Sequence, residues 1–474
     1  MLGNYRVRTP ACLLMLAGLE AVIFVASFYL GMTVSWVGVP GTLAQALEAL
    51  PQALLYSGVL WLTMFAVGAY HRDYVLKRAE VVARMIVGFA VSFAVLTALF
   101  FAVPALSIWR SIVVIALASA FLGVIVVRVW APRLMDLDLL KRRLVVIGVG
   151  AQAAKIEALE QTGAALGFVC LGYVAAGDEP VEVAAERILP GIDSGIDSGV
   201  DSGVDSLVDA LKERRVDEVV VAVRDRRRGL PQRALVDCRL AGMTVVDYAT
   251  FYAEETGQID LEALQPSWFL YSEGFSGLRS YKPLKRVMDV VAALGLLVLS
   301  LPVSLLSAGA ILVAGGGPVL HRQVRVGLGG RPFVLWKFRS MGPDAERDGG
   351  PQWATPDDPR ITAIGGWLRR TRIDEIPQLV NVLKGDMSFV GPRPERPHFV
   401  TQHSDELPFY GDRHSLKPGL TGWAQLNYPY GASPQDARKK LQYDLYYVKF
   451  CSFVLDMIII LQTARVIIWP HSMR

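Results

Sequence analysis

Charged residues are scarce in this sequence. They make up 19% of the 474 residues against 53% hydrophobic residues, and the mean hydropathy is +0.37. This composition excludes an ordinary soluble enzyme, while the length allows two to four domains. Lys and Arg exceed Asp and Glu by only 48 to 44. The charge balance therefore gives no sign of a nucleic-acid partner, and none is expected.

Cysteines are also few. The sequence has four, without a C-x-x-C pair or a spacing typical of a metal site: Cys12, Cys170, Cys238 and Cys451. This scatter argues against a disulfide framework and places the parts outside a membrane in a reducing compartment.

Long apolar runs fill the first 130 residues, at 11–34, 51–70, 81–103 and 107–130. Each approaches the ~20 residues that span a bilayer, so we expect a four-helix transmembrane domain over 1–135. Basic residues precede the first run, join the second to the third and follow the fourth, whereas the stretch 35–50 has none. By the positive-inside rule, both ends of this bundle face the cytoplasm.

One carboxylate, Glu20, lies inside the first apolar run. A charge at the centre of a span costs about 2.5–3.5 kcal/mol on insertion scales. Glu20 marks a lipid or ion path, or it is satisfied by a neighbouring helix. The second interpretation is favoured.

Residues 136–278 alternate between apolar strand segments and helical segments, which predicts a Rossmann-like, doubly wound α/β domain. Strands are expected at 143–148, 168–174, 216–223 and 243–249. The turn at 148–153 matches the dinucleotide pattern G-x-G-x-x-A, but the acidic residue expected about 20 positions later is missing. A bare glycine turn in a scaffold domain is therefore favoured over a bound cofactor.

A repeat of an apolar residue, Asp, Ser and Gly runs over 191–206 within this domain. Its evenly spaced Asp residues suggest calcium, yet the pattern fits neither the EF-hand nor the glycine-rich nonapeptide repeat. A solvated linker of variable length is the favoured interpretation.

A fifth apolar run covers 287–314 and contains Ser300 and Pro302. Pro302 removes a helical hydrogen bond and bends the helix, and Ser300 is placed to satisfy a freed backbone group. Basic residues flank both ends of the run, so a true span would put one basic flank outside the cell. We therefore predict a re-entrant helix that enters and leaves by the cytoplasmic face. A kinked span is the alternative.

Two adjacent carboxylates, Asp374 and Glu375, open a helical pattern that ends at Lys384-Gly385. Alone, this is an ordinary helix start, where the helix dipole stabilises anions and favours a phosphate site. Cations crowd this pair, however. They are Lys337 and Arg339, which share one face of a strand, then Arg369, Arg370 and Arg372, and finally Arg393, which Pro392 and Pro394 restrain.

The charge pattern indicates chemistry at phosphorus. Arginine matches phosphate oxygens bidentately. Adjacent carboxylates cannot flank a glycosidic bond from opposite sides, which argues against glycoside hydrolysis. An Asp374 nucleophile with a Mg²⁺-binding neighbour, Glu375, fits better. The expected catalytic domain covers 279–474 and has an α/β fold with the re-entrant helix.

Five segments of this domain resemble the bacterial sugar transferase family, the monotopic polyprenyl-phosphate hexose-1-phosphate transferases. They are KRVMD (285–289), KFRSM (337–341), RIDEIPQLVNVLKGDMSFVGPRPE (372–395), KPGLTGWAQLNYPYG (417–431) and YDLYYVK (443–449). Long-form members, of the undecaprenyl-phosphate glucose or galactose phosphotransferase type, also have four N-terminal spans and a Rossmann-like domain, so the whole chain resembles them.

The resemblance implies a two-step reaction on the cytoplasmic face of the bacterial inner membrane. Asp374 would attack the β-phosphorus of a UDP-hexose, releasing UMP and leaving a phosphosugar on the carboxylate. Undecaprenyl phosphate would then accept this phosphosugar, which begins exopolysaccharide or O-antigen synthesis. The hexose and the pathway stay open, and a homodimer is an expectation only.

The resemblance also implies roles for single residues. Glu375 matches the Mg²⁺-linked position, and Arg393 matches the phosphate binder of the Pro-Arg-Pro motif. Other matches are to basic positions that line the site, Lys337 and Arg369, and to the break in the re-entrant helix, Ser300 and Pro302.

Two other functions stay open. Tyr281 and Lys285 form the Tyr-x-x-x-Lys pair that a membrane-anchored, NAD-dependent nucleotide-sugar dehydratase or epimerase requires. Pro283 predicts that Tyr281 lies before the helix, which argues against this class. The other alternative is a non-catalytic chain whose middle domain senses a ligand and whose last domain docks partners.

Overall fold

The computed structural model describes residues 11–35, 47–67, 78–104, 108–134, 141–161, 167–176, 179–189, 202–224, 230, 232–264, 278–315, 317–342, 345, 358–429, 431 and 433–468. The chain forms two compact units. One covers Val7–Glu255, and the other combines Thr256–Arg474 with Met1–Arg6.

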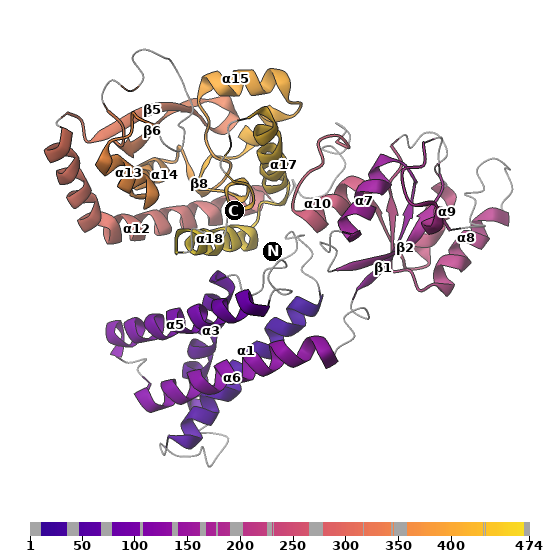
Figure 1. Cartoon of the computed structure of the whole chain (residues 1–474), viewed down its shortest axis with the longest axis horizontal. Helices are drawn as coiled ribbons and strands as arrows, with labels where there is room; N and C mark the ends of the chain where they lie inside the picture. The colour runs from indigo at the N-terminus through magenta and orange to yellow at the C-terminus, as the bar shows by residue number, and fades with distance from the viewer. Residues whose placement is uncertain are drawn as a thin grey trace. The chain divides into compact units, whose positions relative to one another are not determined.

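The first unit begins with a bundle of four apolar helices (Figure 1): α1 (Ala11–Val34), α3 (Leu50–Ala66), α5 (Arg78–Ala102) and α6 (Arg110–Leu134). Helix α1 packs against α3 and α6, and α3 packs against α5. Of these four, α1, α5 and α6 are long and apolar enough to cross a bilayer, whereas α3 is shorter, at 17 residues.

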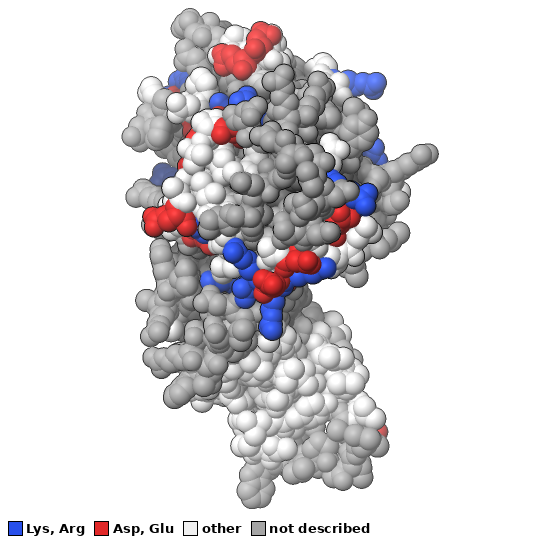
Figure 2. Space-filling view, turned by 90° about the vertical axis from the view of Figure 1, so that its right-hand side faces the viewer, with Lys and Arg blue, Asp and Glu red and all other residues white. Residues whose placement is uncertain are grey.

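The outer surface of the bundle is apolar. Exposed side chains include Val22, Leu54, Phe93 and Leu122, and the bundle in the lower part of Figure 2 shows almost no charged residue. Contiguous exposed apolar surface of this extent is unfavourable in water and favourable in lipid. The chain is accordingly a membrane protein.

The buried carboxylate of the bundle has a partner. Arg128 on α6 donates from Nε to Glu20 Oε1 at 2.6 Å and from Nη2 to Glu20 Oε2 at 3.1 Å. Both side chains are buried, so the two charges satisfy each other inside the bundle. The favoured interpretation of Glu20 is confirmed.

The rest of the first unit is a parallel sheet with the order β2-β1-β3-β4. Its strands are β1 (Arg142–Ile147), β2 (Phe168–Val174), β3 (Glu218–Val221) and β4 (Thr244–Asp247). Its helices are α7 (Ala151–Gln161), α8 (Ser202–Glu213), α9 (Gln232–Leu240) and α10 (Tyr248–Thr256). The strand order reverses at β1, as in doubly wound sheets. The predicted strand–helix alternation and the four strand positions are confirmed.

The repeat predicted as a linker lies largely outside the described residues. Its last five residues, 202–206, begin α8, so the repeat runs into a helix and is not a linker throughout. The cysteines with described side chains, Cys170, Cys238 and Cys451, are free and buried.

The glycine turn between β1 and α7 is covered by a carboxylate of the same domain. Gly148 has a φ of +123°, which favours glycine, and a Cβ on Gly150 would collide with the Glu179 carboxylate. Glu179 Oε1 also accepts a hydrogen bond from Arg224 N at 2.5 Å. The anion beside this turn is therefore a side chain of the chain itself.

The second unit is built on α12 (Leu278–Gly315), a helix of 38 residues with Pro283 and Pro302 inside it. Its middle exposes apolar side chains such as Leu299 and Leu306. Figure 1 shows the ribbon of α12 running along the lower edge of this unit and then turning upward toward the strand β5 (Leu320–Val326).

Pro302 leaves the carbonyl of Val298 without its helical donor. Ser300 Oγ donates to the neighbouring carbonyl, that of Leu297, at 3.3 Å. Ser300 thus binds the backbone of the turn before Pro302, one residue away from the group that the proline frees.

Both ends of α12 contact the same globular domain. Near its start, Arg286 donates to the carbonyls of Val382 and Leu383 at 2.6 and 2.7 Å, and Asp289 accepts from Phe389 N at 2.8 Å. Near its end, Ile311 packs into a core cluster with Phe338 and Leu368. The exposed middle of α12 therefore loops out of a domain that holds both of its ends.

The globular part begins with a hairpin of β5 and the antiparallel β6 (Pro332–Phe338). The helices that follow are α13 (Ala363–Arg370), α14 (Gln378–Lys384), α15 (Pro397–Glu406), α16 (Trp423–Asn427), α17 (Pro434–Phe450) and α18 (Phe453–Ile468). A short parallel pair, β7 (Ser388–Val390) and β8 (Gly419–Thr421), lies between them in the chain.

Candidate active site

One asparagine joins the helix after the acidic pair to the edge of the hairpin. Asn381 on α14 accepts from Trp336 N at 3.1 Å and donates to Val334 O at 2.7 Å. This replaces a missing neighbour strand for β6 and fixes α14 beside it. The two carboxylates before α14 are thereby held next to Lys337 of β6.

A glycine brings α13 against the end of the same strand. A Cβ on Gly365 would collide with the backbone of Ser340, and Thr362 N donates to Ser340 O at 3.1 Å. Thr362 also caps α13, because its side chain accepts from Gly365 N at 3.0 Å. This close packing places Arg369, on the last turn of α13, near the acidic pair.

Asp374 and Glu375 lie in a 3₁₀ turn, Ile373–Glu375 (η6), and not in the first turn of α14, which begins at Gln378. The helix thus begins three residues after Glu375, and the predicted N-terminus is too early. Arg372 before the turn has φ 59° and ψ 13°, a left-handed conformation that costs of order 1–2 kcal/mol for a residue with a Cβ. The strain turns the chain so that both carboxylates face the cations.

The two carboxylates differ in their partners. Glu375 Oε1 accepts from Arg393 Nη2 at 3.2 Å and from Arg372 Nη1 at 3.3 Å. Asp374, which is 7% exposed, accepts no hydrogen bond on its carboxylate within the described part of the chain. Asp374 is therefore the carboxylate with both oxygens available for reaction.

Their pKa values move in opposite directions. Burial, and then the charge of Glu375, raise the pKa of Asp374 to about 6, against the opposing effect of Lys337, Arg369 and Arg372. Burial alone would also raise the pKa of Glu375, but Arg393 and Arg372 outweigh it and lower that pKa. Two groups with such separated environments can take two different roles.

Lys337 faces this pair from β6. Burial, and then the charges of Arg325 and Arg393, lower its pKa to about 8. The two carboxylates act in the opposite direction. Lys337 is thus a cation close to neutrality in a crowded, basic site.

Two of the cations named from sequence are directed elsewhere. Arg339 lies just beyond the end of β6, with its guanidinium packed against Gly317. Arg370 donates to Gly366 O of its own helix at 3.2 Å. The alternation along a strand gave the correct face for Lys337, but it did not reveal that the chain leaves the strand before Arg339.

Every backbone carbonyl of the Pro-Arg-Pro-Glu segment 392–395 is hydrogen-bonded. Gly419 N donates to Pro392 O at 2.9 Å, Arg413 Nη2 to Arg393 O at 2.9 Å, Arg325 Nη1 to Pro394 O at 3.0 Å, and Val326 N to Glu395 O at 2.9 Å. The two prolines restrict their own φ angles, and these hydrogen bonds hold the rest of the backbone of the segment. The guanidinium of Arg393 is therefore aimed at Glu375.

The segment Gly419–Gly422 is packed too closely against Gly391 for any larger residue. A Cβ on Gly391, Gly419 or Gly422 would collide with the backbone of the other loop. This close approach explains the glycines of the KPGLTG motif, which let it pack against the loop that carries Arg393.

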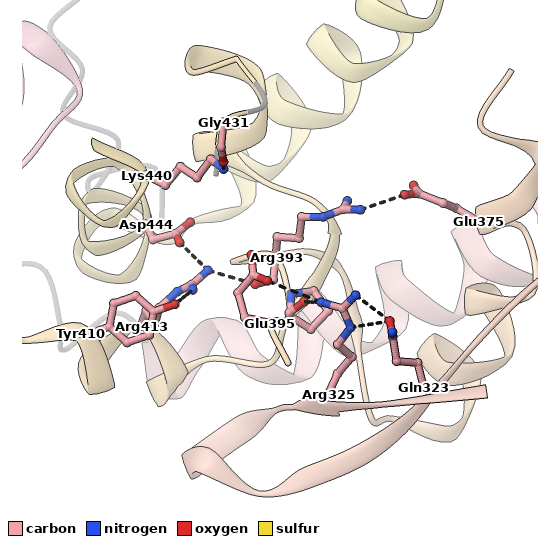
Figure 3. A network of polar contacts seen from close by, with 11 residues as sticks. Gln323, Arg325, Glu375, Arg393, Glu395, Tyr410, Arg413, Gly431, Lys440 and Asp444 are labelled. Atoms are coloured by element: carbon pink, nitrogen blue, oxygen red, sulfur yellow. Dashed lines mark hydrogen bonds and ion pairs between the residues drawn. The ribbon is translucent and has the colours of Figure 1, made fainter. Parts of the chain in front are cut away.

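A second polar group lies behind Arg393 (Figure 3). Arg413 donates to Asp444 at 2.7 Å and to the Tyr410 hydroxyl at 2.7 Å. Glu395 lies beside them and pairs with Arg325 at 3.4 Å. Sequence reasoning missed these residues, because their contacts join segments far apart in the chain. The sequence offered a signal only for Asp444, a carboxylate among apolar and aromatic residues in YDLYYVK.

A cavity of about 440 Å³ connects these groups to the bend of α12. Its wall includes Leu296 and Ser300 of α12, Glu375, Arg393 and Thr463 of α18. Asp374 lies one residue behind the wall and does not line the cavity. The space is apolar toward α12 and α18 and polar toward Arg393 and Arg413.

The Tyr-x-x-x-Lys pair has a structural partner. Tyr281 donates from its hydroxyl to Asp456 Oδ2 at 2.6 Å, and Lys285 binds the same oxygen. Tyr281 lies on α12, so the prediction that it precedes the helix is wrong. Pro283 is tolerated because the clamp on the buried Asp456 holds both side chains to α18.

The donor set suits a magnesium ion. Mg²⁺ is usually held by one or two carboxylates together with substrate phosphates and water. Asp374 and Glu375 offer such oxygens, and a divalent cation there would relieve the repulsion that helps to raise the pKa of Asp374. No group of three or more His, Cys, Asp or Glu side chains that could hold a metal occurs among the described residues.

The site defines a class of protein: a membrane-associated enzyme scaffold that holds a buried carboxylate directly behind the wall of a cavity lined by Glu375 and several cations. The family model for bacterial sugar transferases matches residues 280–470. These residues contain every group described above, from Tyr281 to Thr463.

Curated relatives agree with this match. One is the UDP-N-acetylgalactosamine-undecaprenyl-phosphate N-acetylgalactosaminephosphotransferase of Aeromonas hydrophila, 41% identical over 263 residues, which are 55% of this chain and 61% of the relative. Another is the UDP-glucose:undecaprenyl-phosphate glucose-1-phosphate transferase of Escherichia coli (strain K12), 41% identical over 196 residues, which are 41% of this chain and 42% of the relative.

A shorter relative is covered more completely. It is the uncharacterised sugar transferase EpsL of Bacillus subtilis (strain 168), 42% identical over 186 residues, which are 38% of this chain and 86% of the relative. The chain belongs to the bacterial sugar transferase family. It spans about two-fifths to three-fifths of the length of the two longer relatives.

Proposed function

We propose that this chain transfers hexose 1-phosphate from a UDP-hexose to undecaprenyl phosphate. The observation that carries the proposal is Asp374, a buried carboxylate without hydrogen bonds among the described residues, beside cations directed at the same point. The names of the relatives support a nucleotide-sugar donor and this lipid acceptor.

The proposed reaction has two displacements at one phosphorus. An oxygen of Asp374 bonds to the β-phosphorus, and the bond to the bridging oxygen breaks, so UMP leaves with the electron pair. An oxygen of undecaprenyl phosphate then bonds to the same phosphorus and frees the Asp374 carboxylate. Neither step needs a general base, because both nucleophiles are already anions.

The cations have distinct tasks in this scheme. Arg393 and Arg372 are paired with Glu375 at rest and are within reach of a phosphate that enters beside it. Lys337 and Arg369 act on Asp374 itself. Bound Mg²⁺, held by Glu375, would neutralise negative charge on the phosphates of the donor. The protein groups thus position the phosphates of the donor and neutralise their charge, as phosphoryl transfer requires.

We also propose that α12 is re-entrant and that the site faces the cytoplasm at the inner membrane. Both ends of α12 bind one domain, and its middle is apolar and exposed. The middle domain is proposed to be a Rossmann-like scaffold, since the Glu179 carboxylate already lies over its glycine turn.

No observation favours the dehydratase alternative. The tyrosine and lysine of its motif are both bound to Asp456, and they lie on α12. A dehydratase would need that pair beside a nicotinamide.

The test is release of UMP by the purified full chain. UDP-hexoses are supplied one at a time with undecaprenyl phosphate and Mg²⁺, and UMP and the lipid product are measured together. We expect both to appear in equal amounts for at least one donor. Without the acceptor, radioactive phosphosugar should remain on the protein and map to Asp374. UMP release that continues unchanged in Asp374→Asn would remove Asp374 from the role of nucleophile.

A further inference from the structure

The polar end of the cavity has a composition that the transfer of phosphate does not explain. Six residues, here called the inner compartment, line the cavity behind Arg393: Glu395, His403, Tyr410, Arg413, Lys440 and Asp444. All except Lys440 are at least nine-tenths buried. Buried groups of this kind are costly unless they serve a partner or one another.

Part of the inner compartment is internally satisfied. Arg413 is bound to Asp444, to the Tyr410 hydroxyl and to the Arg393 carbonyl. Its two terminal nitrogens are therefore occupied, and two carboxylates lie beside it. A phosphate would meet the charges of Glu395 and Asp444 here, so this end of the cavity is unsuited to an anion.

Two other polar atoms of the inner compartment are unsatisfied. The Nδ1 of His403 and the Nε of Arg413 are fully buried and have no hydrogen-bond partner among the described residues. Burial lowers the pKa of His403, so its imidazole is neutral near pH 7. Native interiors seldom leave such atoms unsatisfied.

Lys440 lies across the inner compartment from Arg393. Its Nζ donates to the carbonyl of Gly431 at 2.5 Å, and burial lowers its pKa despite the nearby Glu395. Figure 3 shows Lys440 and Asp444 on one side and Arg393 on the other, and all three line the cavity. Arg393 joins the two ends of the cavity, because its backbone is held by Arg413 and its guanidinium reaches Glu375.

We infer that the inner compartment binds hydroxyl groups of a sugar ring of the nucleotide-sugar donor, either the ribose or the hexose. The inference rests on the proposed function. Charged acceptors, charged donors and a neutral imidazole in a buried space match vicinal hydroxyls, each of which donates and accepts. A pocket built to bind hydroxyls rejects analogues that lack them, so this end of the cavity also sets donor specificity.

The first test uses the full chain with Lys440→Met and the matched control Lys439→Met, whose side chain is exposed. We expect Lys440→Met to raise the KM for the UDP-hexose about 10- to 100-fold, the effect of losing hydrogen bonds from a charged donor. The kcat should change by only a few-fold. Lys439→Met should behave as wild type.

A second variant guards against misfolding at position 440. His403→Phe keeps a ring of similar shape without the nitrogens, and His398→Phe, at an exposed position, is its control. We expect His403→Phe to raise the donor KM as well, with the thermal midpoint unchanged. Donor KM values within twofold of wild type in both Lys440→Met and His403→Phe, or a loss confined to kcat, would overturn the inference.

UMP separates the two sugars, because it carries the ribose without the hexose. If Lys440→Met weakens UDP-hexose but leaves the inhibition constant of UMP unchanged, the inner compartment binds the hexose. If both weaken equally, it binds the ribose. Should the wild type form no product from any UDP-hexose, the proposed function fails. Calorimetric binding of UDP-hexose and UMP to the same variants would still decide this inference.

Discussion

Burial and the charge of Glu375 raise the pKa of Asp374 to about 6, whereas a nucleophile has to be ionised. The folded pKa exceeds the unfolded value of about 3.9, so stability is lost as the pH rises from about 4 to 6. At neutral pH the ionised Asp374 costs roughly 1–3 kcal/mol of stability. Ionisation of Glu375 has the opposite effect on stability, because the pKa of Glu375 is lowered in the folded protein.

Asp374→Asn should therefore abolish transfer and raise the thermal midpoint at pH 7.5. The gain should disappear near pH 4, where the wild-type carboxyl is protonated. Glu375→Gln, of equal size, should lower the midpoint at pH 7.5, because it removes the ion pairs with Arg393 and Arg372. Thermal unfolding in detergent at both pH values is the measurement. A destabilised Asp374→Asn would show that the carboxylate is held by attraction and not strained by burial.

The rate should depend on pH with two limits. Asp374 sets the acid limit of kcat/KM near pH 6, because the nucleophile is lost on protonation. Lys337 sets the alkaline limit near pH 8, because burial and nearby arginines lower its pKa to about 8 and its cation is lost above that pH. Lys337→Arg should keep the acid limit and remove the alkaline one, since arginine stays protonated. An alkaline limit unchanged in this variant would assign it to another group.

The acidic pair and four of its cations could be predicted from sequence because they are close in the chain or follow a strand pattern. Arg325, Arg413 and Asp444 could not, because only the folded backbone brings them to the segment 392–395. Arg339 was predicted as a site residue, and Arg370 as a cation beside the acidic pair, from their spacing alone. Spacing predicts the face of an element on which a side chain lies. It does not show that the side chain packs against a glycine, as Arg339 does, or donates to a nearby carbonyl, as Arg370 does.

Among the helices, α12 shows how far local rules extend. The apolar run and Pro302 were sufficient to predict a bent membrane helix. They were insufficient at its start, where Pro283 suggested a later beginning and the clamp on Asp456 extends the helix to Leu278. Tertiary contacts overrode the local preference of proline there.

The re-entrant geometry that we propose for α12 predicts the accessibility of its two flanks. Single cysteines at Lys282 and Arg331, both exposed, should react with an impermeant maleimide only from the cytoplasmic side. A cysteine at Leu299, in the apolar middle, should react from neither side. The chain for this experiment lacks its four native cysteines and is first checked for transfer. Labelling of one flank from outside the cell would establish a kinked span instead.

For the chain as a whole, the compact catalytic unit begins before the boundary suggested by sequence. Gly257 O accepts from Trp423 Nε1 at 2.8 Å, and Ile259 N donates to Gln442 O at 3.0 Å. Ile259 and Leu261 are buried. A short segment after the α/β domain thus belongs to the catalytic unit. No local sequence pattern predicts this, because the contacts of the segment are with residues far along the chain.

A truncation to 256–474 should keep Mg²⁺-dependent transfer and a sharp unfolding transition. A truncation to 279–474 holds the same active-site residues, but it loses several buried apolar side chains and at least three hydrogen bonds, those of Gly257, Ile259 and Glu262. We expect its stability to fall by about 2–5 kcal/mol, with measurable transfer at low temperature. Equal thermal midpoints for the two truncations would show that the segment 256–264 adds nothing to the unit.

The ion pair in the helical bundle has a consequence for the synthesis of the chain. Glu20 and Arg128 are 108 residues apart, which a ribosome needs roughly 5 to 20 seconds to add. During that interval α1 carries a carboxylate whose guanidinium does not yet exist, and leaving it alone in lipid is costly. Until α6 follows, the first helix bears this cost of about 2.5–3.5 kcal/mol in the membrane. The fourth helix of the bundle then removes it by supplying Arg128.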